Sequence, residues 1–278
     1  SPMRDAAALL RPRIGVRPEA VLSAVAIASA LGFGLTLGLW WIDDRLLDGL
    51  SVWAKPLKFE AALAVHAGTL ALVAARLGAP ARAGRALWTI AVVFVVACVV
   101  EMGWIIWQGA RGEHSHFNDS TALHRAMFTV MAVAAILITG AAAALAVLVW
   151  RDTGYRAPAP VKAGIVLGLT GGTVLTIMTA MTIGATGSPY VGAIPHLTAR
   201  MPVTGWSLTG GDLRVAHFLA THMMQAVPLA ALLVCLVRPG RAGLPAVLCV
   251  ATLWTLWTGL EFQAALDGQP LLSWLPAF

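Results

Sequence analysis

Charged residues are scarce in this chain, and its cysteines form no recognisable pairs. Asp, Glu, Lys and Arg make up 12% of the 278 residues, about half the charged fraction of an average soluble domain. Together with a mean hydropathy of +0.79, this scarcity excludes a disordered chain, a fibrous protein and an ordinary cytosolic enzyme. Cys98, Cys235 and Cys249 lie in apolar runs without a CxxC pair, which excludes a disulfide framework and favours roles as small core residues.

Most of the chain consists of long apolar runs. A membrane-spanning helix needs about 20 predominantly apolar residues, and seven such runs follow one another with short connectors, apart from a Gly/Pro-rich stretch at 187–212. We therefore predict an all-α integral membrane bundle of seven transmembrane helices at 20–264, preceded by a segment at 1–19 and followed by a tail at 265–278. The expected spans are 20–41, 57–76, 87–109, 122–150, 162–185, 213–237 and 243–264.

The basic residues are divided unequally between the two sides that these spans create. If the N-terminus is cytoplasmic, the cytoplasmic segments carry 12 of the 19 Lys and Arg residues but only three of the 13 acids. Basic loops mark the cytoplasmic side, so the pattern predicts a cytoplasmic N-terminus and a C-terminus outside. The formal net charge of +6 then reflects these loops and does not indicate nucleic-acid binding. The 12 basic residues are Arg4, Arg11, Arg13, Arg17, Arg76, Arg82, Arg85, Arg151, Arg156, Lys162, Arg238 and Arg241.

On this topology, most of the remaining ionisable side chains gather in the outer half of the bundle. Such side chains are costly at membrane depth and usually face a bundle interior or a water-filled cavity. We therefore expect one polar chamber that opens toward the outer face. All seven histidines belong to this half: His66, His114, His116, His124, His196, His217 and His222.

The expected chamber offers donor groups that are typical of transition-metal sites. Neutral imidazoles are common ligands of zinc, copper and iron, and Glu101 places a carboxylate roughly two turns below the interface. The leading hypothesis is a metal- or haem-dependent enzyme in which Glu101, His217 and Arg214 take part in catalysis. The candidate metal ligands are His66, His116, His124, His217, His222 and Glu101.

The spacing of the histidines fixes neither their partners nor the metal. His66 either faces the site or is a core histidine bonded to a neighbouring carbonyl group. His217 and His222 lie about 140° apart around one helix, too far for the i,i+4 pair of a zinc-binding helix, so we expect them to serve different partners. The cofactor stays open between iron, as haem or non-haem iron, copper and zinc.

Five basic residues of the outer half suit an anionic group. Arginine and lysine side chains pair with haem propionates or with the phosphate or carboxylate of a lipid headgroup. The candidates for this role are Lys55, Lys58, Arg111, Arg125 and Arg214.

Three short strings carry a resemblance to a known family. They are Lys-Pro-Leu-Lys-Phe at 55–59, Arg-Gly-Glu-His-Ser-His-Phe-Asn at 111–118 and Gly-Asp-Leu-Arg-Val-Ala-His-Phe at 211–218. Over most of its length, the chain resembles an uncharacterised family of bacterial multi-span inner-membrane proteins, from which it departs by an additional histidine at position 114. The resemblance implies a bacterial inner-membrane setting and carries no activity.

Three classes of function remain open at this point. The first is the metal- or haem-dependent enzyme, expected to be an oxidoreductase that acts on a lipid-soluble substrate. The second is a zinc-dependent or metal-free hydrolase or transferase that binds an anionic lipid headgroup. The third is a non-enzymatic carrier or sensor, although the inner halves of the helices have almost no ionisable residue, which disfavours a continuous translocation path. In each class the expected partner is a membrane lipid or lipid-soluble small molecule, and the oligomeric state is open.

Overall fold

Seven long helices dominate the structure, a computed structural model that describes residues 16–192, 194–196 and 199–275. Each of the seven is long and apolar enough to cross a membrane. They are α2 (Pro18–Ile42), α3 (Ala54–Ala74), α5 (Arg85–Arg111), α6 (Ala122–Arg151), α7 (Ala159–Thr186), α8 (Leu213–Val237) and α9 (Leu244–Leu266). The shorter elements are α4 (Ala79–Arg82), η2 (Gly240–Gly243), β1 (Leu46–Leu47), β2 (Leu50–Ser51), β3 (Tyr190–Val191) and β4 (Gly211–Asp212).

The prediction of a seven-span helical bundle is confirmed, and every predicted span agrees with its helix to within three residues at each end. Local signals explain where several helices begin. The Thr121 side chain accepts a hydrogen bond from the backbone N–H of His124 and caps α6. Asp212 caps α8 in the same way by accepting from the N–H of Arg214. Ser, Thr and Asp are preferred at such positions because they satisfy N–H groups that the first helical turn leaves free.

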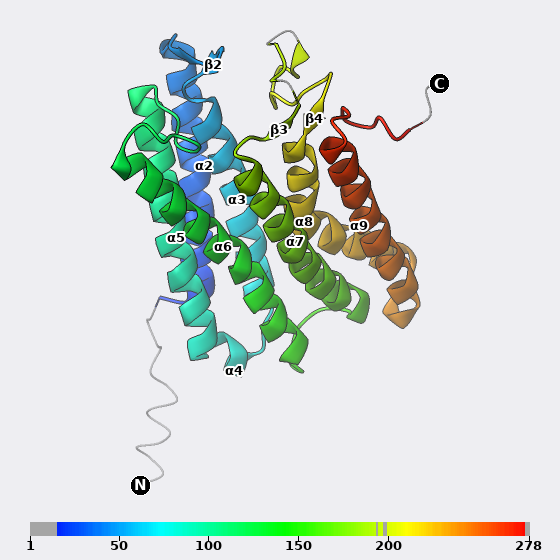
Figure 1. Cartoon of the computed structure of the whole chain (residues 1–278). Helices are drawn as coiled ribbons and strands as arrows, with labels where there is room; N and C mark the ends of the chain where they lie inside the picture. Colours follow the sequence, from blue (N-terminus) through cyan, green and yellow to red (C-terminus); the bar gives the residue numbers. More distant parts are fainter. Residues whose placement is uncertain (1–15, 193, 197–198, 276–278) are drawn as a thin grey trace.

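The helices run alternately up and down, so that neighbours in sequence also pack side by side (Figure 1). The central helix α7 packs against α6, α8 and α9, whereas α3 packs mainly against α2 and α5. The closest packing is between α7 and α8. The two groups of helices meet where α6 lies against α7 and where α3 approaches α8.

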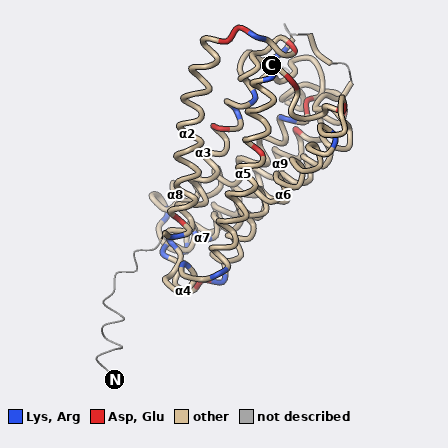
Figure 2. Tube along the Cα trace, turned by 90° about the vertical axis from the view of Figure 1, so that its left-hand side faces the viewer, with Lys and Arg blue, Asp and Glu red and all other residues tan. Residues whose placement is uncertain are grey.

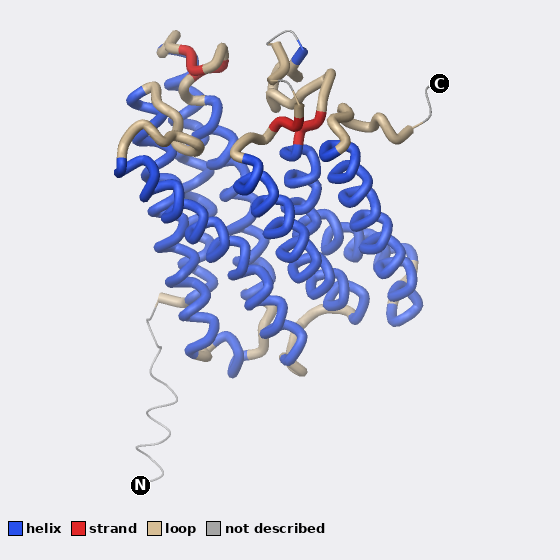
Figure 3. Tube along the Cα trace, viewed as in Figure 1, coloured by secondary structure: helices blue, strands red, loops and turns tan. Residues whose placement is uncertain are grey.

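The two ends of the bundle differ in structure. One, which we call the strand end, carries both small antiparallel sheets and the connections 43–53, 112–121 and 187–212 (Figure 3). The pairing of β3 with β4, which sets Tyr190 opposite Asp212, ties the end of α7 to the start of α8. The other, which we call the α4 end, carries the start of α2, the short helix α4 and the turn η2 (Figure 1).

Most charged residues lie toward these two ends, and few lie in the middle of the bundle (Figure 2). Many large apolar side chains on the outside of the bundle are exposed, including Leu35 at 73% and Leu236 at 81%. Hydrocarbon is a favourable environment for such side chains. The buried core includes Leu70, Phe94 and Leu145, which are fully buried among the helices.

Small residues bring α7 and α8 together. A β-carbon added to Gly164 would lie 2.5 Å from the β-carbon of Ala231, and one added to Gly168 would lie 2.7 Å from Cδ of Pro228. Glycine at these positions therefore permits a helix contact that a larger side chain would prevent. Gly164, Gly168 and Gly172 recur every four residues, so they share one face of α7, which is the small-residue pattern of a close helix contact.

Candidate active site at the strand end

A partly buried histidine lies between a lysine and a glutamate at the strand end. Nζ of Lys55, in the first turn of α3, lies 2.9 Å from Nδ1 of His116. On the other side of the same imidazole, Nε2 lies 3.8 Å from Oε1 of Glu101 on α5. The Glu101 side chain is only 4% exposed and that of His116 is 23% exposed. These three residues, which we call the Lys55–His116–Glu101 site, join α3, α5 and the 112–121 connection.

The hydrogen bonds of the site assign the histidine tautomer. The Lys55 ammonium has only donors, so it donates to Nδ1 of His116 and leaves the ring proton on Nε2, facing Glu101. Burial, followed by the positive charge of Lys55, lowers the pKa of His116 to about 3. The imidazole is therefore neutral at pH 7. The second carboxylate oxygen of Glu101 is buried and has no hydrogen-bond partner among the described residues.

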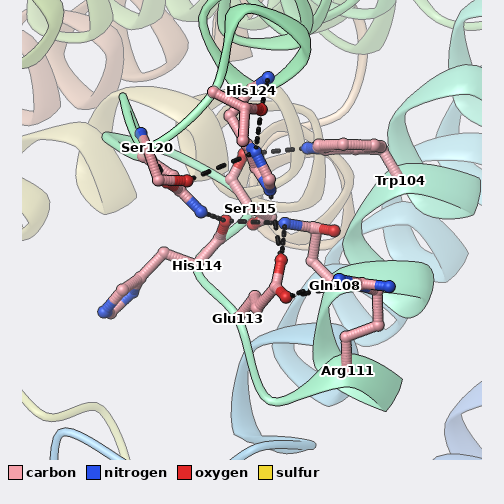
Figure 4. Close-up of polar contacts among 10 residues, drawn as sticks. Trp104, Gln108, Arg111, Glu113, His114, Ser115, Ser120 and His124 are labelled. Carbon is pink, nitrogen blue, oxygen red and sulfur yellow. Dashed lines mark hydrogen bonds and ion pairs between the residues drawn. The ribbon is translucent and has the colours of Figure 1, made fainter.

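The connection that carries His116 is held by side chains of α5 (Figure 4). Nε1 of Trp104 donates to the carbonyl oxygen of Ser115 over 3.0 Å, and Nε2 of Gln108 donates to that of His114 over 3.1 Å. The hydroxyl of buried Ser115 also lies 3.1 Å from Nδ1 of His116. These contacts fix the backbone immediately before His116 and orient its ring.

The backbone immediately after His116 is in an unusual conformation. Phe117 has a φ of +55°, a left-handed conformation that is unfavourable for a residue with a bulky side chain. Its ring packs 5.3 Å from that of Phe128 on α6, and the ring of Phe128 lies edge-on to His116 at 6.3 Å. Strained backbone of this kind persists where the surrounding structure fixes it and is frequent at functional sites.

The candidate residues His124 and Arg111 belong to a network beside the site (Figure 4), and Arg125 contacts the same hairpin. Nε2 of His124 lies 3.2 Å from Glu113, which also pairs with Arg111 at 2.7 Å. The hydrogen bond from Arg111 holds the pKa of Glu113 below its ordinary value. Arg125 donates to the carbonyl oxygen of Asp119 over 2.8 Å. All of these partners lie between the end of α5 and the start of α6, so the network stabilises this hairpin.

Arg214 is part of another set of contacts at the start of α8. Its guanidinium pairs with Asp212 at 2.6 Å and donates to the carbonyl oxygen of Gly205 over 2.8 Å. It also lies over the Tyr190 ring at 4.7 Å. Nearby, Lys58 on α3 donates to the carbonyl oxygen of Thr204 over 3.3 Å. Arg214 thus holds the 199–212 segment against the start of α8, and Lys58 contacts the same segment from α3.

The three remaining candidate histidines lie deeper in the bundle and have separate partners. Nε2 of His66 lies 3.4 Å from the carbonyl oxygen of Ile138, as expected for a core histidine. Nδ1 of His217 lies 2.9 Å from the Thr179 hydroxyl, and Nδ1 of His222 lies 3.2 Å from Gln225. His217 and His222 therefore do serve different partners, as their spacing predicts.

The predicted metal ligands do not assemble into one cluster. Among the residues that the structure describes, no group of three or more His, Cys, Asp or Glu side chains is arranged to hold a metal ion. The predicted zinc, copper, iron or haem site therefore rests on the residue types alone and stays a prediction.

Sequence reasoning missed the contributions of Ser115 and Tyr190. Ser115 stands visibly between two histidines, but its contact with His116 depends on the conformation of the connection.

No protein-family model, curated protein or solved structure matches this chain. The chemistry of the site is therefore argued from its own side chains.

Proposed function

We propose that this protein is a bacterial inner-membrane enzyme that performs metal-free acid–base chemistry on a lipid with an anionic headgroup, as a hydrolase or transferase. The observation that carries the proposal is the position of His116 between Lys55 and Glu101. A titratable cluster in a buried position is the usual composition of an acid–base site. This is the second of the three classes that the sequence leaves open.

The three side chains have complementary roles in moving a proton. The neutral imidazole accepts at Nδ1, from the side of Lys55, and its Nε2–H faces Oε1 of Glu101 at 3.8 Å. A carboxylate with one buried and unpartnered oxygen is a proton acceptor that faces little competition from water. Glu101 accordingly acts as the general base toward a substrate hydroxyl or water and keeps the proton, while His116 stays neutral and helps to orient the carboxylate.

Lys55 and Lys58 suit the anionic part of the substrate. They are three positions apart on α3, so their side chains are neighbours on the helix surface. The ion pairs of the described residues include neither lysine, whereas Arg111 and Arg214 already pair with Glu113 and Asp212. Two ammonium groups without a direct carboxylate partner attract phosphate or carboxylate.

The proposal assigns the strand end to the outer face of the membrane. The support is the distribution of charge, because the described residues at the α4 end include nine Lys and Arg residues and only two acids, and basic segments mark the cytoplasmic side. The site would then act on lipids of the outer leaflet.

The test is a lipid analysis of proteoliposomes made from a bacterial polar lipid extract. We expect the wild-type protein to convert at least one anionic lipid, detected by liquid chromatography and mass spectrometry. Glu101→Gln should abolish the conversion, since the amide cannot take up the proton. Glu113→Gln, which alters a carboxylate of the neighbouring network, is the matched control and should remain active. An unchanged lipid profile with wild-type protein would contradict the proposal.

Treatment with a chelator distinguishes this proposal from the metal-dependent enzyme. Conversion should continue after dialysis against EDTA, and elemental mass spectrometry of protein purified without a nickel column should find no stoichiometric iron, copper or zinc. Loss of conversion with EDTA and its recovery with one metal would instead favour the metal-dependent enzyme.

A further inference from the structure

A groove between α2 and α3 lies at the α4 end, at the opposite end of the bundle from the Lys55–His116–Glu101 site. Its volume is about 500 Å³, which is within the range of small-molecule sites. Small and apolar side chains from both helices form most of its wall, among them Ala20, Ala26, Gly68, Ala71 and Ala75. The groove thus offers an apolar channel between α2 and α3.

The mouth of the groove is polar and carries both signs of charge. Arg17 and Glu19 line it where α2 begins. Oε1 of Glu19 lies 3.8 Å from Nε of Arg82, but Oε2 is buried and has no hydrogen-bond partner among the described residues. A carboxylate that is largely buried and has no hydrogen-bond donor is costly, typically by roughly 1–3 kcal/mol or more, so a ligand that donates to the Glu19 carboxylate at the mouth would be favoured there.

The start of α2 also suits a phosphate group. Arg17 is exposed and takes part in none of the ion pairs of the described residues. It stands at the N-terminus of α2, which has no side-chain cap, and uncapped helix N-termini are favourable positions for phosphate. Basic groups between helices at the cytoplasmic side are a recurring feature of phospholipid sites.

We propose that this groove binds an aminophospholipid, a zwitterionic lipid with a phosphate and a primary ammonium, such as phosphatidylethanolamine. The phosphate pairs with Arg17, the ammonium donates to the Glu19 carboxylate, and one acyl chain lies along the small residues of α2 and α3. A quaternary ammonium headgroup has no N–H to donate to Glu19, and an anionic headgroup is repelled by it. The groove therefore selects the primary amine.

The test is a lipid titration of the full-length protein in detergent, followed by native mass spectrometry. Dioleoylphosphatidylethanolamine and dioleoylphosphatidylcholine have identical acyl chains, so their comparison isolates the headgroup. We expect the wild-type protein to bind the ethanolamine lipid about tenfold more tightly, as one charge-assisted hydrogen bond allows. Equal affinity for the two lipids would overturn the proposal.

Three variants assign the binding to this groove. Glu19→Gln should reduce the preference for ethanolamine to about twofold or less, and Arg17→Gln should weaken binding of both lipids. Gly68→Leu should also weaken both, because a β-carbon at this position meets only Ala26 at 3.9 Å and the rest of the side chain extends into the groove. Arg241→Gln, which removes a cation of the same end outside the groove, is the matched control and should bind like the wild type.

Two other occupants would overturn the proposal. A chain that lacks residues 1–14 should keep the preference for ethanolamine, whereas loss of the preference would assign the partner of Glu19 to that segment. A change of oligomeric state in Gly68→Leu without any headgroup preference in the wild type would assign the groove to a second copy of the chain.

Discussion

The contact between α7 and α8 and the Lys55–His116–Glu101 site are assembled in opposite ways. Gly164 and Gly168 allow the two helices to approach closely without any charged group. At the site, by contrast, charged and polar side chains from α3, α5 and a connection meet across longer distances, and one oxygen of Glu101 is left unpartnered. Apolar close packing stabilises a membrane fold, whereas buried titratable groups without a full set of hydrogen-bond partners are typical of functional sites. The bundle thus separates the region that holds its helices together from the region that we propose as the reactive site.

Replacing Glu101 should have the largest effect and should act on the site alone. We expect Glu101→Gln to lower the rate of lipid conversion by roughly 10²–10⁴-fold, the usual contribution of a general base. The thermal unfolding midpoint should change little, since the amide has nearly the same shape and is neutral in a buried position. The rate is measured in proteoliposomes and the midpoint by tryptophan fluorescence. An equal loss of rate in the Glu113→Gln control would show that Glu101 has no special role as the general base.

A larger residue in the α7–α8 contact should have the reverse pattern. Gly164→Leu forces a side chain against Ala231 and the carbonyl oxygen of Val227, and overpacking of this kind costs about 1–3 kcal/mol. The unfolding midpoint should fall clearly, while the rate per folded molecule stays close to that of the wild type. Gly140→Leu on α6 is the control, because no atom lies within 4 Å of a β-carbon added there. Equal destabilisation by both substitutions would show that close packing is not what distinguishes the α7–α8 contact.

Acidification should weaken the fold through His116. Its pKa is about 3 in the folded protein, against an ordinary value of 6.5. The unfolded chain therefore takes up this proton first as the pH falls, so the stability contributed by the neutral imidazole is complete above pH 6.5 and is lost toward pH 3. By pH 5 the loss is about 2 kcal/mol. Midpoints measured between pH 7.5 and 5 should fall more steeply in the wild type than in His116→Gln. His114→Gln, which replaces an exposed histidine, is the control and should follow the wild type. If its midpoint depended on pH as weakly as that of His116→Gln, the pH dependence would not originate from His116.

Removal of Arg111 should have the smallest effect on either quantity. Its ion pair with Glu113 is exposed to solvent, at 52% and 33% of the two side chains, and exposed pairs contribute little to stability. We expect Arg111→Gln to keep both the wild-type midpoint and the wild-type conversion rate within experimental scatter. A marked loss of conversion would instead return Arg111 to the substrate-binding residues that the sequence predicts.

The sequence predicts the helices well because a single physical quantity determines them. Long apolar runs define the spans, and the short connectors leave little freedom in where each helix begins and ends. Thr121 and Asp212 show that even the caps follow from local chemistry. In both cases all the information lies within a few residues of sequence.

The site was less predictable, because its contacts join distant residues. Lys55 and His116 are 61 positions apart, and no local pattern indicates that the 112–121 connection turns back over α3. Helix periodicity groups Lys55 with His66, yet His66 lies beside a carbonyl group of α6 while Lys55 contacts His116. Residue types alone also suggest five usable cations, but Arg111 and Arg214 are paired by acids only two positions away.

The burial of Glu101 has a consequence for how the chain enters the membrane. An acidic residue near the centre of a helix opposes insertion by roughly 2.5–3.5 kcal/mol, and each Leu, Ile, Phe or Val favours it by roughly 0.3–0.6 kcal/mol. The many apolar residues of Arg85–Arg111 outweigh the carboxyl group, so this helix is able to insert by itself. Lys55 has by then already been synthesised, whereas His116 follows Glu101 by 15 positions. The order of the chain therefore provides the counter-charge first, the carboxyl group second and the histidine that links them last.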